Sequence, residues 1–335
     1  MLSLAMLLGG VMMAACARAP VVQSISGPTM GSTYQVKVVT DRSIAEVRSV
    51  GAKQLLAFDV AFSSWRDNSE IVRVNNHRST APLAVSPLFG GVLEQALVIA
   101  DATGGAFDPT MKPLSDLYRA AKEDPAAVFE DAQFVAAKQR VGYRQVSVED
   151  GKLVKQRPDV LLDLDGIVAG AAADAIADEL VALGIEAFYL EITGEVLCRG
   201  VEPDGAVWRI GVVDPSSDAS SGQRAIVTLP LRDRALCSSG DYRNAVIMGG
   251  RVIHHLFDPR TGRNPEHAVV SASVIADSCA VADALGTALM VLGDASGKEL
   301  WPAMKELGAH SALFLKPGVD TVWREVKIEW PEEDS

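Results

Sequence analysis

The sequence predicts a single compact α+β domain, in which mixed or antiparallel strands pack against helices and a ligand cleft lies between two lobes. The chain has 335 residues, 48% of them hydrophobic and 22% charged, which is enough apolar material for a sizeable core. Segments with strand and helix periodicity alternate irregularly. No G-x-G-x-x-G motif follows a predicted strand, which argues against a dinucleotide-binding Rossmann domain.

The N-terminal part of the chain predicts a strand followed by helices. Residues 24–39 begin with a Gly-Pro turn and continue as a strand, because apolar and polar side chains alternate there. Residues 43–62 and 89–102 carry apolar side chains at helical spacing. Between them, Ser69 and Glu70 are expected to cap the turn that follows.

The middle of the chain predicts strands and a glycine-containing turn. Residues 160–183 indicate an apolar strand, a tight Asp/Gly turn and a helix whose free N–H groups could face an anion. Residues 188–198 and 208–215 each indicate a strand. Residues 253–257 indicate a short strand that runs into a turn, so neighbouring His254 and His255 should point to opposite faces.

The C-terminal part predicts a strand at residues 268–275 and then a helix capped by Asp277 or Ser278. Apolar residues at helical spacing form the expected core stripe of this helix: Val281, Leu285, Leu289 and Leu292. Beyond Gly293, a separate helix at 298–307 and a strand at 312–315 are expected.

The charge balance restricts the possible partners. A net charge of −12 and a pI near 4.9 argue against a nucleic-acid partner, because clustered Lys and Arg hold phosphate backbones. A diphosphate ligand would also be repelled unless a cation intervened. The composition therefore favours a metal-bridged anion site over a basic one.

The N-terminus indicates export. Residues 1–15 are apolar and uncharged but shorter than the roughly 20 residues of a membrane span, as in a signal peptide. Met13-Ala14-Ala15-Cys16 resembles the bacterial lipobox, which predicts a lipid on Cys16 and a lipoprotein at the periplasmic face of the inner membrane. The alternative is a plain signal peptide in which Cys16 is incidental.

The expected boundaries are a signal peptide with lipobox at 1–16, a linker at 17–23, one domain at 24–328 and an acidic tail at 329–335. The remaining cysteines lack C-x-x-C spacing, so neither a zinc site nor a disulfide framework is indicated. They are expected to be buried small hydrophobic residues: Cys198, Cys237 and Cys279.

Asp283 and Thr287 are the strongest candidates for chemistry. They stand four residues apart and therefore share a helical face, with no basic residue nearby in the sequence. A carboxylate and a hydroxyl are hard oxygen donors, which suit magnesium better than zinc. The alternative is a partly exposed Asp beside a Thr that bonds back to its own helix.

These residues stand in an ordered set of motifs. His255 and the Asp258-Pro259-Arg260-Thr261-Gly262 loop precede Ala282–Leu289, ADALGTAL. In this order they resemble the ApbE family of flavin transferases, and the resemblance extends from about Gly27 to Gly293. It implies an enzyme that cleaves FAD and attaches FMN through a phosphoester to a Thr or Ser of a target protein, releasing AMP.

The resemblance also implies site residues. Magnesium would be held by Asp283, Thr287 and the backbone carbonyl of Val168, and His255 would be the general base or phosphate partner, so that His255 and Asp283 are the catalytic candidates. The residues implied to contact FAD are Met30, Trp65, Asp108, Gly166, Ser239, Gly240, Asp241, His255 and Asp258. Trp65 could stack on an aromatic ring of the ligand.

The sequence departs from the family pattern at two positions. Asp165 stands where the family has the first Gly of a pair, and Ala169 stands where it has a Lys. The missing lysine removes a charge-assisted hydrogen bond to phosphate. Basic residues that could replace its charge are Arg209, Arg243, Arg260 and Arg263.

The resemblance implies a target protein in a membrane redox complex, but two further functions stay open. One is an FAD-binding or carrier lipoprotein that has lost transferase activity together with the lysine. The other is a magnesium-dependent FAD pyrophosphatase, in which water replaces the acceptor hydroxyl.

Overall fold

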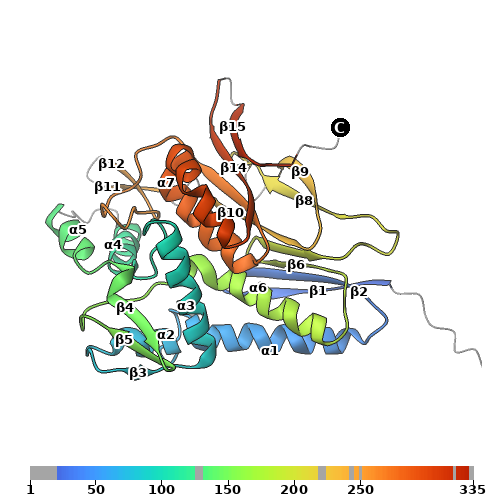
Figure 1. The fold of residues 1–335 in the computed structure, drawn as a ribbon, viewed down its shortest axis with the longest axis horizontal. Coiled ribbons are helices and arrows are strands. Elements are labelled where there is room, and N and C mark those ends of the chain that lie inside the picture. Colours follow the sequence, from blue (N-terminus) through green and yellow to red (C-terminus); the bar gives the residue numbers. More distant parts are fainter. Residues whose placement is uncertain are drawn as a thin grey trace, which may run out of the picture.

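The computed structural model describes residues 21–124, 131–217, 224–240, 245–248, 251–319 and 322–331. Its centre is an eight-stranded antiparallel sheet with the strand order β1–β2–β6–β7–β10–β13–β14–β15 (Figure 1). The predicted α+β class is confirmed. The strands of this sheet are β1 (Val21–Thr29), β2 (Ser32–Thr40), β6 (Phe188–Ile192), β7 (Glu195–Arg199), β10 (Arg234–Gly240), β13 (Ser271–Ala276), β14 (Ala309–Pro317) and β15 (Trp323–Ile328).

Helices α1 (Ile44–Phe62), α6 (Asp165–Ala182) and α7 (Cys279–Glu306) cover one face of this sheet. The other helices of the described residues are α2 (Glu70–Asn76), α3 (Pro87–Ala102), α4 (Lys112–Glu123) and α5 (Asp131–Lys138). The main core lies where α1, α6 and α7 pack on the sheet, and the hairpin of β8 (Trp208–Val213) and β9 (Ala225–Leu231) packs on the opposite face. The sheet is therefore buried on both sides.

The first hairpin differs from the prediction. The turn lies at Met30 and Gly31, both with positive φ of 47° and 73°, which suits a two-residue hairpin. Gly27 and Pro28, predicted to form the turn, lie inside β1. Proline is tolerated there because β1 is the edge strand of the sheet. This strand begins at Val21, so the domain starts earlier than the predicted linker at 17–23 allowed.

Three other predicted elements are wrong in detail. Residues 160–164 form no strand; instead Leu162 exchanges two hydrogen bonds with the Asn75 side chain, at 2.7 and 2.9 Å. Residues 188–198 form two strands around a turn at Thr193 and Gly194. The strand predicted at residues 268–275 is β13, which begins only at Ser271 and ends at Ala276.

Helix α7 begins as predicted, with the Ser278 hydroxyl as N-cap, and its predicted core stripe is buried. The separate helix predicted at 298–307 is the second part of α7, beyond a kink at Gly293. Among the described residues, only α7 is long and apolar enough to span a membrane, and 78% of its most apolar window is buried. Burial in the core accounts for its apolar composition.

The C-terminal boundary also differs from the prediction. The Trp330 side chain, in the segment predicted as an acidic tail, packs in the core beneath β8 and β9. The domain therefore extends past residue 328, whereas residues 332–335 lie outside the described part. Cys198, Cys237 and Cys279 are buried free thiols, as predicted. The N-terminal segment with Cys16 lies outside the described residues.

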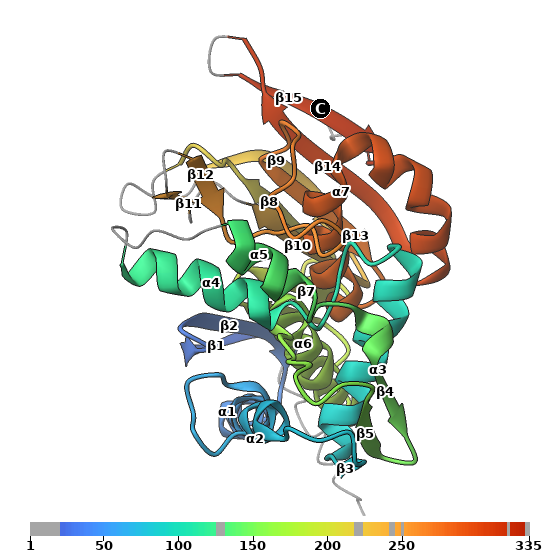
Figure 2. The ribbon, with the colours of Figure 1, turned by 90° about the vertical axis from the view of Figure 1, so that its left-hand side faces the viewer.

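Two small sheets complete the fold. The first joins β3 (Leu83–Ala84), β5 (Lys152–Lys155) and β4 (Val146–Glu149), which follows a 3-10 turn at Tyr143–Gln145. The second pairs β11 (Ala245–Met248) with β12 (Arg251–His254). Helices α4 and α5 lie beside β11 and β12 (Figure 2) and share a separate apolar cluster with Phe257. Helix α4 and Phe257 of this group also line a cleft between this part of the molecule and helices α6 and α7.

Candidate active site

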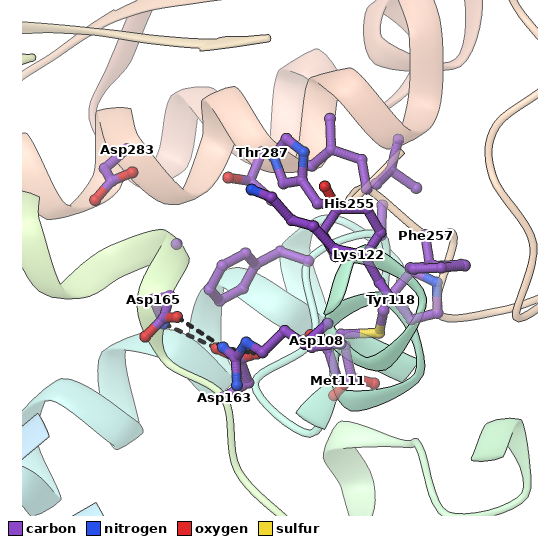
Figure 3. Close-up of a pocket in the computed structure, with 18 of the residues that line it drawn as sticks. Asp108, Met111, Tyr118, Lys122, Asp163, Asp165, His255, Phe257, Asp283 and Thr287 are labelled. Atoms are coloured by element: carbon purple, nitrogen blue, oxygen red, sulfur yellow. Dashed lines mark hydrogen bonds and ion pairs between the residues drawn. The ribbon is translucent and has the colours of Figure 1, made fainter. Parts of the chain in front are cut away.

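A cleft of about 620 Å³ lies between α4, the first turn of α6 and the middle of α7 (Figure 3). We call it the main cleft. Its volume is in the range of small-molecule sites. Segments far apart in the sequence contribute to it, and it contains many of the residues predicted from sequence: Trp65, Asp108, Gly166, His255, Asp283 and Thr287.

Helices α6 and α7 are fixed against each other near the cleft. The Asp174 carboxylate on α6 accepts hydrogen bonds from the Ser278 hydroxyl at 2.7 Å and from the N–H groups of Cys279 and Ala280 at 2.8 and 2.9 Å. A carboxylate at a helix N-terminus is favourable because it pairs with free N–H groups and the helix dipole. A Cβ on Gly170 would lie 2.4 Å from the Cys279 carbonyl oxygen, so the two backbones cross in close contact.

Asp283 is buried one turn further along α7. Its Oδ2 accepts a hydrogen bond from the Gly170 N–H at 3.1 Å. Burial raises the pKa of Asp283 well above its ordinary value of 3.8, and the nearby Glu195 carboxylate raises this pKa further. A carboxyl group in such surroundings ionises readily only if a cation compensates its charge. The position of Asp283 therefore suits a cation ligand.

Thr287 and the start of α6 lie beside Asp283. A Cβ on Gly166 would come within 3.2 Å of the Thr287 hydroxyl, so only glycine leaves this approach free. Val168 does not line the main cleft, but it stands two residues before the Gly170 N–H that bonds Asp283. A carboxylate, a hydroxyl and backbone oxygens fit magnesium. The described residues contain no group of three His, Cys, Asp or Glu side chains that could hold a metal.

His255 lines the main cleft directly after strand β12. Its Nδ1 is buried and has no hydrogen-bond partner within the described part of the chain, and its ring lies 6.2 Å from that of Tyr118. Burial lowers the pKa of His255 to about 4, with further contributions from His254 and Lys122. The imidazole is therefore neutral near pH 7 and can accept a proton or a hydrogen bond.

Asp108 and Asp258 belong to similar Phe-Asp-Pro loops and hold those loops in shape. Asp108 accepts bonds from the Thr110 N–H and hydroxyl and from the Tyr143 N–H, at 2.6–2.9 Å, and burial raises its pKa. Asp258 accepts three bonds from Arg260 at 2.8–2.9 Å. Both loops reach the main cleft, but Asp258 itself does not line it.

Trp65 is 90% exposed, which is unusual for so large an apolar side chain. It lines the main cleft and also an adjoining cleft of about 290 Å³. Residues common to both clefts are Trp65, Arg119, Glu123, Asp163 and Asp165. The two clefts thus adjoin each other along these shared residues.

Several predicted contact residues do not line either cleft in the described structure. Met30 is 37% exposed at the tip of the first hairpin. Ser239 and Gly240 lie in β10, where the Ser239 hydroxyl faces α7, 2.9 Å from where a Cβ of Gly286 would stand. Asp241 lies outside the described residues. Ser239 thus supports the helix segment between Asp283 and Thr287.

The residues of α4 that line the main cleft were not predicted from the sequence. Tyr118, Arg119 and Lys122 line the main cleft from this helix. Arg119 pairs with Asp163 and Asp165 on the opposite wall, at 3.8 and 3.2 Å. The Asp163 carboxylate raises the pKa of Asp165, and Arg119 opposes that effect. Helical spacing of these side chains after the Phe-Asp-Pro loop was the available signal.

Comparison with known proteins identifies the same fold and sequence pattern. The sequence model of the ApbE family matches residues 30–311. The FAD:protein FMN transferase of Vibrio cholerae serotype O1 is 36% identical over 291 residues, covering 86% of each chain. That of Salmonella typhimurium is 33% identical over 306 residues, covering 89% of this chain and 86% of the relative.

Solved structures of ApbE proteins show the same similarity. The flavin transferase ApbE of Vibrio cholerae superposes with a TM-score of 0.79 and 31% identity, covering 91% of this chain and 97% of that one. The apo form of the Pseudomonas stutzeri flavinyl transferase ApbE superposes with a TM-score of 0.80 and 30% identity, covering 92% and 95%. Both similarities extend over nearly the whole domain.

Proposed function

This chain belongs to the ApbE family, and we propose that it is a magnesium-dependent FAD:protein FMN transferase. The observation that carries the proposal is the main cleft, where a buried carboxylate, a hydroxyl and a neutral histidine meet beside an exposed tryptophan. FAD has two aromatic ends joined by a diphosphate, which suits two adjoining clefts that share Trp65.

The oxygen donors of α6 and α7 would hold magnesium. Asp283 and Thr287 supply side-chain oxygens, and the carbonyl of Val168 is the proposed third protein ligand. Bound magnesium would act as a Lewis acid on the diphosphate, where it neutralises negative charge. The acidity of the surrounding chain supports this requirement, because the net charge of −12 repels an uncompensated diphosphate.

His255 would act as the general base that accepts the proton of the acceptor hydroxyl. Its ring is neutral near pH 7, and its buried Nδ1 has no hydrogen-bond partner within the described part of the chain. Attack of a Thr or Ser oxygen on the FMN phosphorus forms a new P–O bond, breaks the P–O bond to AMP and transfers the hydroxyl proton to His255. The products are the FMN phosphoester on the acceptor and AMP.

The acceptor must be a protein segment that reaches the open cleft. We propose an exported subunit of a membrane redox complex, in keeping with a lipid on Cys16 that would anchor this chain at the periplasmic face of the inner membrane. Mass spectrometry of the mature protein tests the anchor: a diacylglyceryl Cys16 at the N-terminus is expected, and an unmodified cleavage product contradicts it.

The transfer itself is tested with purified protein, FAD, magnesium and a Thr-bearing acceptor peptide. We expect the peptide mass to increase by that of FMN less one water, and an equal amount of AMP to appear, only with magnesium present. Intact FAD under these conditions indicates a carrier. Release of FMN and AMP without any acceptor indicates a pyrophosphatase.

A further inference from the structure

The walls of the main cleft are strongly acidic. Among the described residues that line it, five carboxylates face two basic side chains, Arg119 and Lys122. Arg119 is already paired with Asp116, Asp163 and Asp165 at 3.2–3.8 Å. The charge of Arg119 therefore offsets these carboxylates, and we expect a second basic side chain near the phosphates of FAD.

Lys122 has the position for this role. Ser115, Tyr118, Arg119 and Lys122 all line the cleft and follow the spacing of one helical face of α4. Figure 3 shows the Lys122 side chain extending across the cleft toward Thr287 and His255. Lys122 also contributes to the lowered pKa of His255, as a nearby positive charge should.

The other basic residues considered as substitutes do not line the main cleft in the described part of the chain. Arg260 bonds Asp258, Arg263 lines a different cleft beside α5, and Arg209 projects from β8 in the hairpin on the far face of the sheet. Arg243 lies outside the described residues. Ala169, where the resemblance implied a lysine, is buried in the helical core and does not line the cleft.

We propose that Lys122 is a phosphate-binding residue of this site, whose ammonium contacts the diphosphate of FAD opposite the oxygen donors of α7. The inference rests on the proposed function, since it assumes that FAD occupies the main cleft. An ammonium next to phosphate forms charge-assisted hydrogen bonds and offsets the acidic walls. A lysine on α4 thus supplies a charge that α6 lacks.

The test measures the affinity of Lys122→Gln, Lys122→Arg and wild-type protein for FAD and for riboflavin, which has no phosphate. We expect Lys122→Gln to bind FAD about 10- to 100-fold more weakly and riboflavin unchanged. Lys122→Arg should recover most of the FAD affinity. In transfer assays, Lys122→Gln should raise KM for FAD more than it lowers kcat.

Lys152→Gln is the matched control, because it removes one exposed lysine from β5 and should change neither affinity. Equal weakening of FAD and riboflavin by Lys122→Gln, or no weakening of FAD, would overturn the role of Lys122. Failure of the proposed function looks different: wild-type protein would then not transfer FMN at all, whatever residue 122 is.

Discussion

At the scale of single residues, the buried Asp283 carboxylate lowers the stability of the metal-free protein at neutral pH and is also a proposed magnesium ligand. Its carboxylate is buried near Glu195, and the folded state therefore holds its proton more tightly than the unfolded chain does. Stability from this group is greatest near and below its ordinary pKa of 3.8 and is lost as the pH rises toward the raised folded pKa. At neutral pH the metal-free protein has therefore lost this stabilisation.

Asp283→Asn should remove this cost. The amide keeps an oxygen for the Gly170 N–H, so we expect metal-free variant protein to be more stable than wild type at neutral pH, by on the order of 1–3 kcal/mol. Magnesium should no longer stabilise it, and transfer should be lost. Thermal unfolding in EDTA and in magnesium measures both effects. A variant that is less stable than wild type in EDTA would contradict this account.

His255 gives a second prediction, on the pH dependence of transfer. Because its pKa is lowered to about 4, the ring should stay neutral well below the usual His range. The acid limb of kcat/KM that belongs to His255 should therefore lie near pH 4 rather than 6.5. The profile of His255→Gln, which should be slow and lack this limb, identifies it. An inflection near pH 6.5 that disappears in His255→Gln would refute the prediction.

At the scale of elements, the crossing of α6 and α7 positions the oxygen donors. Gly170→Ala would place a Cβ against the Cys279 carbonyl, which is backbone and cannot rotate away. We expect a loss of about 1–3 kcal/mol in unfolding free energy and weaker magnesium binding, because the Gly170 N–H shifts away from Asp283. Denaturant unfolding and magnesium titration measure the two effects.

Gly91→Ala on α3 is the control for this change. A Cβ there meets nothing within 4 Å, so the same substitution should stabilise the helix by roughly 0.5–1 kcal/mol. Destabilisation by Gly91→Ala, or none by Gly170→Ala, would show that the helix crossing is not the sensitive feature.

The elements also show what the sequence could predict. The start of helix α7 was predicted with Asp277 or Ser278 as its cap and with its apolar stripe, because both signals are local, and Ser278 is the cap. The turn at Gly27 was mispredicted, since Pro28 is compatible with a strand only at a sheet edge and strand order is a tertiary property. Asp283, Thr287 and His255 all line the main cleft, and their role there stays a prediction; Lys122 on α4 was not predicted because the residues around it in the cleft are remote in sequence.

At the scale of the whole molecule, acidity couples the proposed metal to the proposed substrate. The chain has a net charge of −12, and five carboxylates but only two basic side chains line the main cleft among the described residues. When FAD or magnesium binds alone, the opposite charge of the other ligand is missing. When both bind, the charges of magnesium and of the diphosphate neutralise one another. Binding of either should therefore strengthen binding of the other by the same factor.

Thermal unfolding measures this coupling between magnesium and FAD. At saturating concentrations, we expect magnesium and FAD together to raise Tm by more than the sum of their separate shifts, because stabilisation follows the combined binding free energy. Riboflavin should show no such synergy with magnesium, since it lacks the diphosphate. Strictly additive shifts with FAD would mean that the two ligands occupy independent sites, and the metal would then have no contact with the diphosphate.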